Sequence, residues 1–93
     1  MISAESVRNL VIEELASVRD VERPVIEELV RIGGDDLEID SKEGQCVAVK
    51  LEARLSMPGM IRPEDQTRSN LTTITSLVRL IHERATAGSR QAV

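Results

Sequence analysis

Aromatic residues are absent from this chain of 93 residues, which contains no phenylalanine, tryptophan or tyrosine. Proteins that bind single-stranded nucleic acids usually stack the bases on aromatic side chains, so the usual platforms for such binding are missing. The formal net charge of −4 also opposes contact with a phosphate backbone. We therefore expect no nucleic-acid partner.

Cysteine and long apolar runs are scarce as well. Cys46 is the single cysteine, so an internal disulfide is excluded and nothing indicates an oxidising compartment. No apolar run approaches the roughly 20 residues that a membrane-spanning helix needs. Residues 1–6 have neither the basic nor the apolar part of a signal peptide. We expect a cytoplasmic protein with no membrane partner.

The residues that are present are typical of one small globular domain. Hydrophobic residues make up 41% of the chain and charged residues 30%. Charge is unevenly spread, because residues 1–43 hold 12 acids and 5 bases whereas residues 44–93 hold 4 acids and 7 bases. We expect a single domain over residues 1–86, followed by a flexible C-terminal tail over residues 87–93.

Apolar residues recur at helical spacing, and the pattern predicts an all-α fold. A first helix begins after the N-cap Ser3 and ends at Asp20, and a short helix over 25–32 has Pro24 at its start and glycines at its end. A long first loop then leads to Ser41. The remaining predicted elements are a helix over 41–55, one short helical turn near 64–67, and a last helix that is capped by Ser69 or Asn70, includes Leu71 and ends at Gly88.

The junction Ile39-Asp40-Ser41 carries the most chemical information. A serine at the start of a helix is commonly an N-cap, which is one interpretation of Ser41. The first backbone N–H groups of a helix also lack partners and face the positive end of its dipole, so a phosphodiester on Ser41 Oγ would be well placed. Both interpretations stay open on these residues alone.

Larger segments of the chain extend this pattern. An opening amphipathic helix leads to a connection that ends in Asp-Asp-Leu-Glu-Ile-Asp-Ser (35–41), and Val-Ala-Val-Lys-Leu-Glu-Ala-Arg-Leu follows at 47–55. Pro-Glu-Asp stands at 63–65, and Asn-Leu-Thr-Thr-Ile-Thr-Ser-Leu at 70–77. In combination these segments resemble the acyl carrier protein family over about residues 6–85. The resemblance implies a small four-helix bundle with a long first loop and a short third helix.

The resemblance also implies a function. Ser41 would carry a covalent 4′-phosphopantetheine arm, transferred from coenzyme A, whose thiol holds an acyl or growing polyketide chain as a thioester. Asp40 matches the family's acidic residue before the serine and would help the modifying enzyme bind its metal and phosphate. The chain itself would hold no catalytic residue and no metal. Its partners would be a phosphopantetheinyl transferase, acyl-loading enzymes and acyltransferases, and ketosynthase-type enzymes, and we expect the chain to be a monomer.

The helix after Ser41 would form the docking surface for these enzymes. Val49 matches an exposed apolar position of the family, and Glu43 and Glu52 match acidic positions on the same helix. Two residues depart from the family pattern: Lys42 stands where leucine is usual, and Gln45 where an apolar residue is usual. Lys42 adds positive charge to a surface that normally meets basic enzymes, so it affects the choice of partner.

Two other functions remain open. An aminoacyl or peptidyl carrier would use the same serine, although such carriers more often have Gly-Gly-Asp-Ser, and here the glycines are separated from Ser41. A helical interaction module would leave Ser41 as a plain N-cap and associate through a strip formed by Cys46, Val49 and Ala53. Cys46 itself is interpreted as a half-buried structural cysteine, because no histidine or lysine accompanies it by motif.

Overall fold

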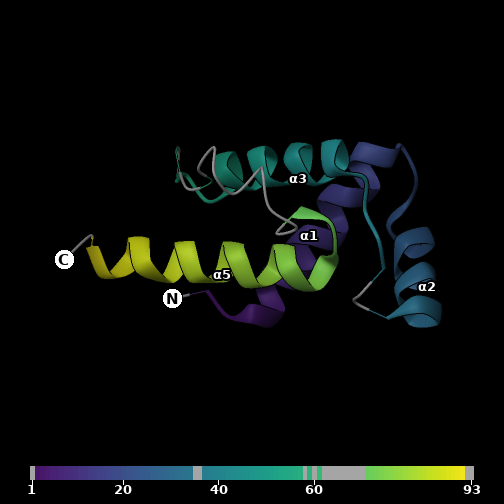
Figure 1. Ribbon diagram of the computed structural model, residues 1–93, viewed down its shortest axis with the longest axis horizontal. Helices are drawn as coiled ribbons and strands as arrows, with labels where there is room; N and C mark the ends of the chain where they lie inside the picture. The colour runs from purple at the N-terminus through teal and green to yellow at the C-terminus, as the bar shows by residue number, and fades with distance from the viewer. Residues whose placement is uncertain (1, 35–36, 58, 60, 62–70, 92–93) are drawn as a thin grey trace.

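The computed structural model describes residues 2–34, 37–57, 59, 61 and 71–91, the last five of these by their backbone alone. The described residues form four helices (Figure 1), which are α1 (Ala4–Arg19), α2 (Arg23–Gly33), α3 (Ser41–Arg54) and α5 (Ile74–Gln91). They contain no strand, and the prediction of a small all-helical bundle is confirmed. The short helix predicted near 64–67 lies outside the described residues. None of the described helices is both long and apolar enough to cross a lipid bilayer.

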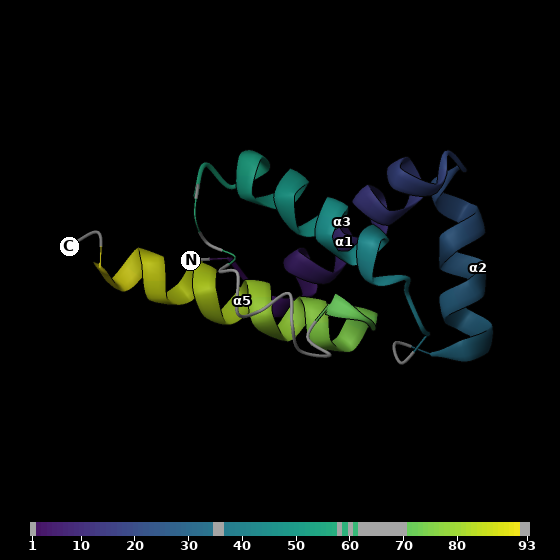
Figure 2. The same ribbon diagram turned by 45° about the horizontal axis from the view of Figure 1, so that its top comes forward.

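Helix α1 lies at the centre of the bundle and packs against α2, α3 and α5 (Figures 1 and 2). Its apolar residues recur every three or four positions, so they share one side of the helix and are buried together. The core is aliphatic throughout. Its buried members are Val7, Val11, Ile12, Leu15, Ala16, Ile26, Val30, Ile39, Val47, Ala48, Leu51, Leu71, Ile74, Leu77, Leu80, Ile81 and Ala85.

The ends of α1 and α2 follow the predicted signals. Ser3 caps α1 by accepting a hydrogen bond from the Ser6 amide at 3.1 Å, and Asp20 ends the helix in the left-handed conformation. Pro24 lies in the first turn of α2, where its missing N–H costs no hydrogen bond. The long first connection, between α1 and α3, therefore contains a complete helix.

Three polar contacts set α1 and α3 antiparallel. Arg19 of α1 forms an ion pair with Glu43 at the start of α3. Ser17 accepts a hydrogen bond from Lys50 Nζ at 3.1 Å, and Glu14 pairs with Arg54 at the end of α3 at 3.0 Å. The residue numbers of these contacts decrease along α1 as they increase along α3, so the two helices run in opposite directions. This arrangement brings the C-terminal end of α1 to the residues around Ser41.

The last helix differs from the prediction at both ends. It begins at Ile74 rather than before Leu71, because Thr73 is the residue that caps it. The hydroxyl of Thr73 accepts from the Ser76 amide at 3.1 Å, and the Ser76 hydroxyl accepts from the Thr73 amide at 3.2 Å. The helix also continues through Gly88 to Gln91, so the predicted end at Gly88 is wrong.

The segments that precede α3 and α5 are joined by a single antiparallel bridge between Glu38 and Thr73. Within it the Ile39 amide donates to the Thr72 carbonyl at 2.7 Å, and the Ile39 side chain is buried in the core. The sequence did not predict this bridge, because so short a pairing leaves no alternation of apolar residues in the sequence. The bridge fixes the chain two residues before Ser41.

Gly44 allows α3 to approach the same segment. A Cβ atom at position 44 would lie 2.0 Å from the carbonyl oxygen of Leu71 and 2.9 Å from the Leu71 Cβ. Real Cβ atoms do not come so close to a carbonyl oxygen, so only glycine fits without a backbone shift. Gly44 is accordingly buried on the inner face of α3.

Gly44→Ala should destabilise the protein by about 3 kcal/mol, because the added methyl group overlaps backbone atoms of Leu71 that cannot rotate away. Urea unfolding followed by far-ultraviolet circular dichroism measures the change. The matched control is Gly33→Ala, whose Cβ would meet only Leu37 Cδ1 at an ordinary 3.7 Å. That variant should be as stable as the wild type or slightly more stable, and equal effects of the two substitutions would contradict the close approach.

Candidate functional site

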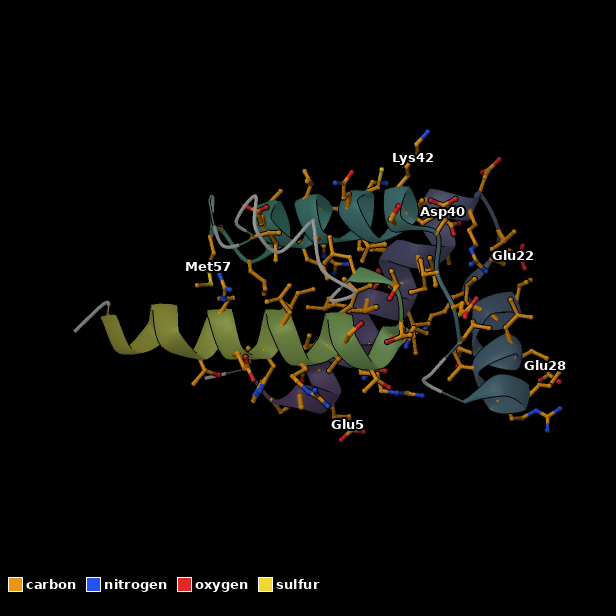
Figure 3. All side chains as sticks on the ribbon, in the orientation of Figure 1. Glu5, Glu22, Glu28, Asp40, Lys42 and Met57 are labelled. Atoms are coloured by element: carbon orange, nitrogen blue, oxygen red, sulfur yellow. The ribbon has the colours of Figure 1, made fainter. Side chains whose placement is uncertain are left out.

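Ser41 is the first residue of α3 and its side chain is exposed. The residue that caps the helix is Asp40, which has a non-helical backbone (φ −57°, ψ 139°), so the interpretation of Ser41 as an N-cap is wrong. Asp40 and Lys42, the residues before and after Ser41, lie at the end of α3 that faces α2 (Figure 3). No hydrogen bond involves the Ser41 hydroxyl within the described part of the chain. The hydroxyl is therefore accessible for a reaction at Oγ.

The first amides of α3 are occupied by Asp40. Its Oδ1 accepts from the Lys42 amide at 2.8 Å, its carboxylate also accepts from the Glu43 amide, and Glu43 Oε1 accepts in return from the Asp40 amide at 3.2 Å. This reciprocal arrangement is a capping box. The sequence suggested that these amides would be unpaired and could bind a phosphodiester on Ser41, but Asp40 already bonds to them. The cation next to Ser41 in the sequence is Lys42.

Arg19 at the end of α1 holds Glu43. The guanidinium Nε lies 2.8 Å from Glu43 Oε2 and Nη2 lies 3.3 Å from Oε1, so the contact is bidentate, and both side chains are 25% exposed. The hydrogen bond from Arg19 is the main reason that the pKa of Glu43 is lowered from its ordinary 4.5, against the opposing effect of partial burial. Glu43 thus ties the start of α3 to α1.

The other predicted docking residues are distributed unevenly over α3. Val49 is 60% exposed, and Lys42 is exposed at the start of the helix. Glu52 accepts a hydrogen bond from the Gly59 amide at 2.7 Å, where the chain turns with φ +79°. Both acidic residues of the predicted docking surface, Glu43 and Glu52, therefore already bond to other parts of the chain.

Cys46 is exposed, so its interpretation as a half-buried structural cysteine is wrong. Together with Gln45, Val49 and Lys50 it lines a shallow, mostly apolar hollow on the outer side of α3. Gly44, Val47, Ala48 and Leu51 take the inner side of the helix. The Cys46, Val49 and Ala53 strip consequently faces solvent.

The site offers an accessible hydroxyl on Ser41 and the carboxylate of Asp40. The one histidine of the sequence, His82, belongs to α5. Among the described residues no group of three or more histidine, cysteine or acidic side chains is arranged to hold a metal ion.

Sequence reasoning missed Arg19. It lies 24 residues from Glu43, and its role depends on how α1 and α3 cross.

Comparison with known proteins adds no assignment: no family model, no curated protein and no solved structure matches this chain.

Glu43→Gln should reduce stability at neutral pH by about 1 kcal/mol, because it removes an ion pair and weakens the capping box. Since folding lowers the pKa of Glu43, its contribution is complete above the unfolded value near 4.5 and is lost as the pH falls through the lower folded value. The stability difference between wild type and variant should therefore shrink on acidification.

Urea unfolding at a series of pH values measures this difference. Glu38→Gln, at an exposed position in the connection before Ser41, is the control and should change stability by less than about 0.5 kcal/mol. In a double-mutant cycle, Arg19→Gln should remove most of the effect of Glu43→Gln. Additive effects of the two substitutions would show that the ion pair contributes nothing.

Proposed function

We propose that this chain is an acyl carrier protein, whose Ser41 bears a 4′-phosphopantetheine arm and presents acyl or polyketide intermediates to biosynthetic enzymes. The observation that carries the proposal is the hydroxyl of Ser41 at the start of α3, directly after Asp40. This hydroxyl is exposed and makes no hydrogen bond with the residues that the structure describes. The sequence resemblance supplies the identity of the arm. A serine that served only to cap the helix would direct its hydroxyl to the first amides, which here bond to Asp40 instead.

Attachment of the arm is a phosphoryl transfer. Ser41 Oγ attacks the pyrophosphate of coenzyme A, a new P–O bond forms at the pantetheine phosphate, and adenosine 3′,5′-bisphosphate leaves. The serine proton passes to a base of the transferase. Asp40, the residue before Ser41, contributes a carboxylate. Once attached, the arm supplies a thiol that carries the cargo as a thioester.

The chain contributes a rigid anchor for this arm. The bridge before Ser41, the capping box around it and the close packing at Gly44 hold the attachment point on both sides. A tethered substrate reaches a docked enzyme at an effective concentration set by the length of the tether, and a fixed anchor defines the volume that the tether explores. Enzymes that load, extend and transfer acyl groups would be the partners.

Docking of these enzymes on α3 would rely on Val49 and Lys42. Both side chains are exposed, whereas Glu43 and Glu52 already bond to Arg19 and to the Gly59 amide. An exposed lysine beside the modified serine favours an enzyme surface with acidic character at that point. This arrangement differs from the acidic patch that the sequence resemblance implied.

Ser41→Ala should abolish modification. Incubation of the wild type with coenzyme A and a broad-specificity phosphopantetheinyl transferase should add the mass of one phosphopantetheine, measured on the intact protein. The control Ser56→Ala, at an exposed serine beyond the end of α3, should be modified like the wild type. A folded wild type that stays unmodified while a control carrier is modified would refute the proposal.

Asp40→Asn separates the two roles of Asp40. Asparagine caps helices about as well as aspartate, so the stability of the variant should stay within about 0.5 kcal/mol of the wild type. The rate of modification should nevertheless fall at least about tenfold, because the amide cannot supply the negative charge that a metal-bound phosphate transfer uses. An unchanged rate would assign Asp40 to capping alone.

A helical interaction module is the second candidate. It is favoured by apolar side chains that the structure leaves exposed, although they lie mainly on α2 and not on the α3 strip that the sequence indicated. Such a module would not be modified at Ser41. The mass measurement above distinguishes it from a carrier.

A further inference from the structure

The outer side of α2 is an apolar surface. The described residues include five exposed large hydrophobic side chains, and four of them belong to this helix or its approach. Val21 is 38% exposed, Val25 47%, Leu29 37% and Ile32 72%. We call these four residues the α2 face.

Three members of the α2 face form a stripe on the helix. Val25, Leu29 and Ile32 are separated by four and three residues, which places them on the same side of α2, and Val21 precedes the helix. Ile26 and Val30 lie roughly 100° round the helix from Val25 and Leu29 and are buried, where α2 packs against α1. Figures 1 and 2 show α2 at the edge of the bundle, with one side toward the other helices and the other side directed away from them. Intrachain packing therefore uses only half of the apolar surface of α2.

The geometry of the stripe suits another helix. Residues four apart form the ridges that pack into the grooves of a neighbouring helix, and Val25 and Leu29 make such a pair on α2. Within α2 the stripe extends about 10 Å from Val25 to Ile32, which is about two turns. A helix packed against α2 would cover this stripe.

The polar rim of the α2 face is acidic. Glu22 lies at the start of α2 and Glu28 on its outer side (Figure 3). Arg31 pairs with Glu28, and Arg23 pairs with Glu27 at 3.3 Å, so these four charges balance and Glu22 leaves the helix acidic by one charge. Residues 1–43, which include α1 and α2, hold 12 acids and 5 bases. This charge repels a second copy of the chain and attracts a basic partner.

We propose that the α2 face docks an amphipathic helix of a partner protein whose apolar side is bordered by lysine or arginine. The apolar stripe provides the contact area and the acidic rim selects the sign of the partner's charge. The proposal concerns α2 and is independent of the modification of Ser41. It therefore applies to the unmodified chain, and it can fail or succeed without deciding whether the chain is a carrier.

The test uses a fluorescently labelled peptide of about 18 residues, long enough for a stable contact, in which leucine and lysine are arranged as an amphipathic helix. Fluorescence anisotropy with the unmodified protein should show saturable binding that weakens as salt is raised from about 50 mM to about 500 mM. A scrambled peptide of the same composition and a leucine–glutamate peptide of the same pattern should bind at least about tenfold more weakly.

Variants of the protein locate the site. Val25→Ser with Ile32→Ser should weaken binding at least about tenfold without loss of fold, because both side chains are exposed in the free protein. Glu22→Gln with Glu28→Gln should weaken binding at low salt and reduce its salt dependence. Val49→Ser, which removes an exposed apolar side chain from α3, is the matched control and should leave binding unchanged.

Three outcomes would overturn the proposal. The first is equal binding of the patterned and scrambled peptides, which would reduce the effect to net charge. The second is loss of binding in Val49→Ser with none in the α2 double variant. The third is concentration-dependent dimerisation in sedimentation that the α2 double variant abolishes, since it would identify the α2 face as an interface between copies of this chain.

Discussion

The contact between Gly44 and the carbonyl group of Leu71 is the constraint on which the rest of this structure depends. Helix α3 can lie against the segment before α5 only because residue 44 has no side chain, and a Cβ there would stand 2.0 Å from the Leu71 oxygen. The same approach permits the bridge of Glu38 with Thr73, in which the Ile39 amide bonds to Thr72. A bundle without aromatic residues has few large side chains to fill gaps, so close backbone packing secures its core.

This constraint determines the character of the candidate site. Ser41 lies between the bridge and Gly44, so its backbone is held on both sides while its hydroxyl remains exposed. The neighbouring carboxylates serve the fold first: Asp40 caps α3, and Glu43 joins α3 to Arg19 of α1. The proposed carrier function therefore depends on the serine, and the acidic residues around it have structural roles that mutational studies must separate.

Local signals allowed much of the fold to be predicted. Ser3, Asp20 and Pro24 act within one turn of their own helices, so the bounds of α1 and α2 followed from spacing and capping rules. Other features depend on contacts between distant segments. The way the helices cross determines four features that were not predicted. These are the cap at Thr73, the bridge at Glu38, the ion pair of Glu43 with a residue 24 positions away and the exposure of Cys46. The α2 stripe is visible in the sequence, but only the fold shows that it remains uncovered.

Amide hydrogen exchange of the unmodified protein tests the central claim, that the start of α3 is locked to the segment before α5. The Ile39 amide is the reporter, because its hydrogen bond to the Thr72 carbonyl at 2.7 Å exists only when the two segments are joined. The account predicts exchange at least about a hundredfold slower than in an unstructured chain, with the Leu77 amide of α5 protected in the same range. Exchange of Ile39 at the rate of an unstructured chain, in a protein whose α5 amides are protected, would contradict it.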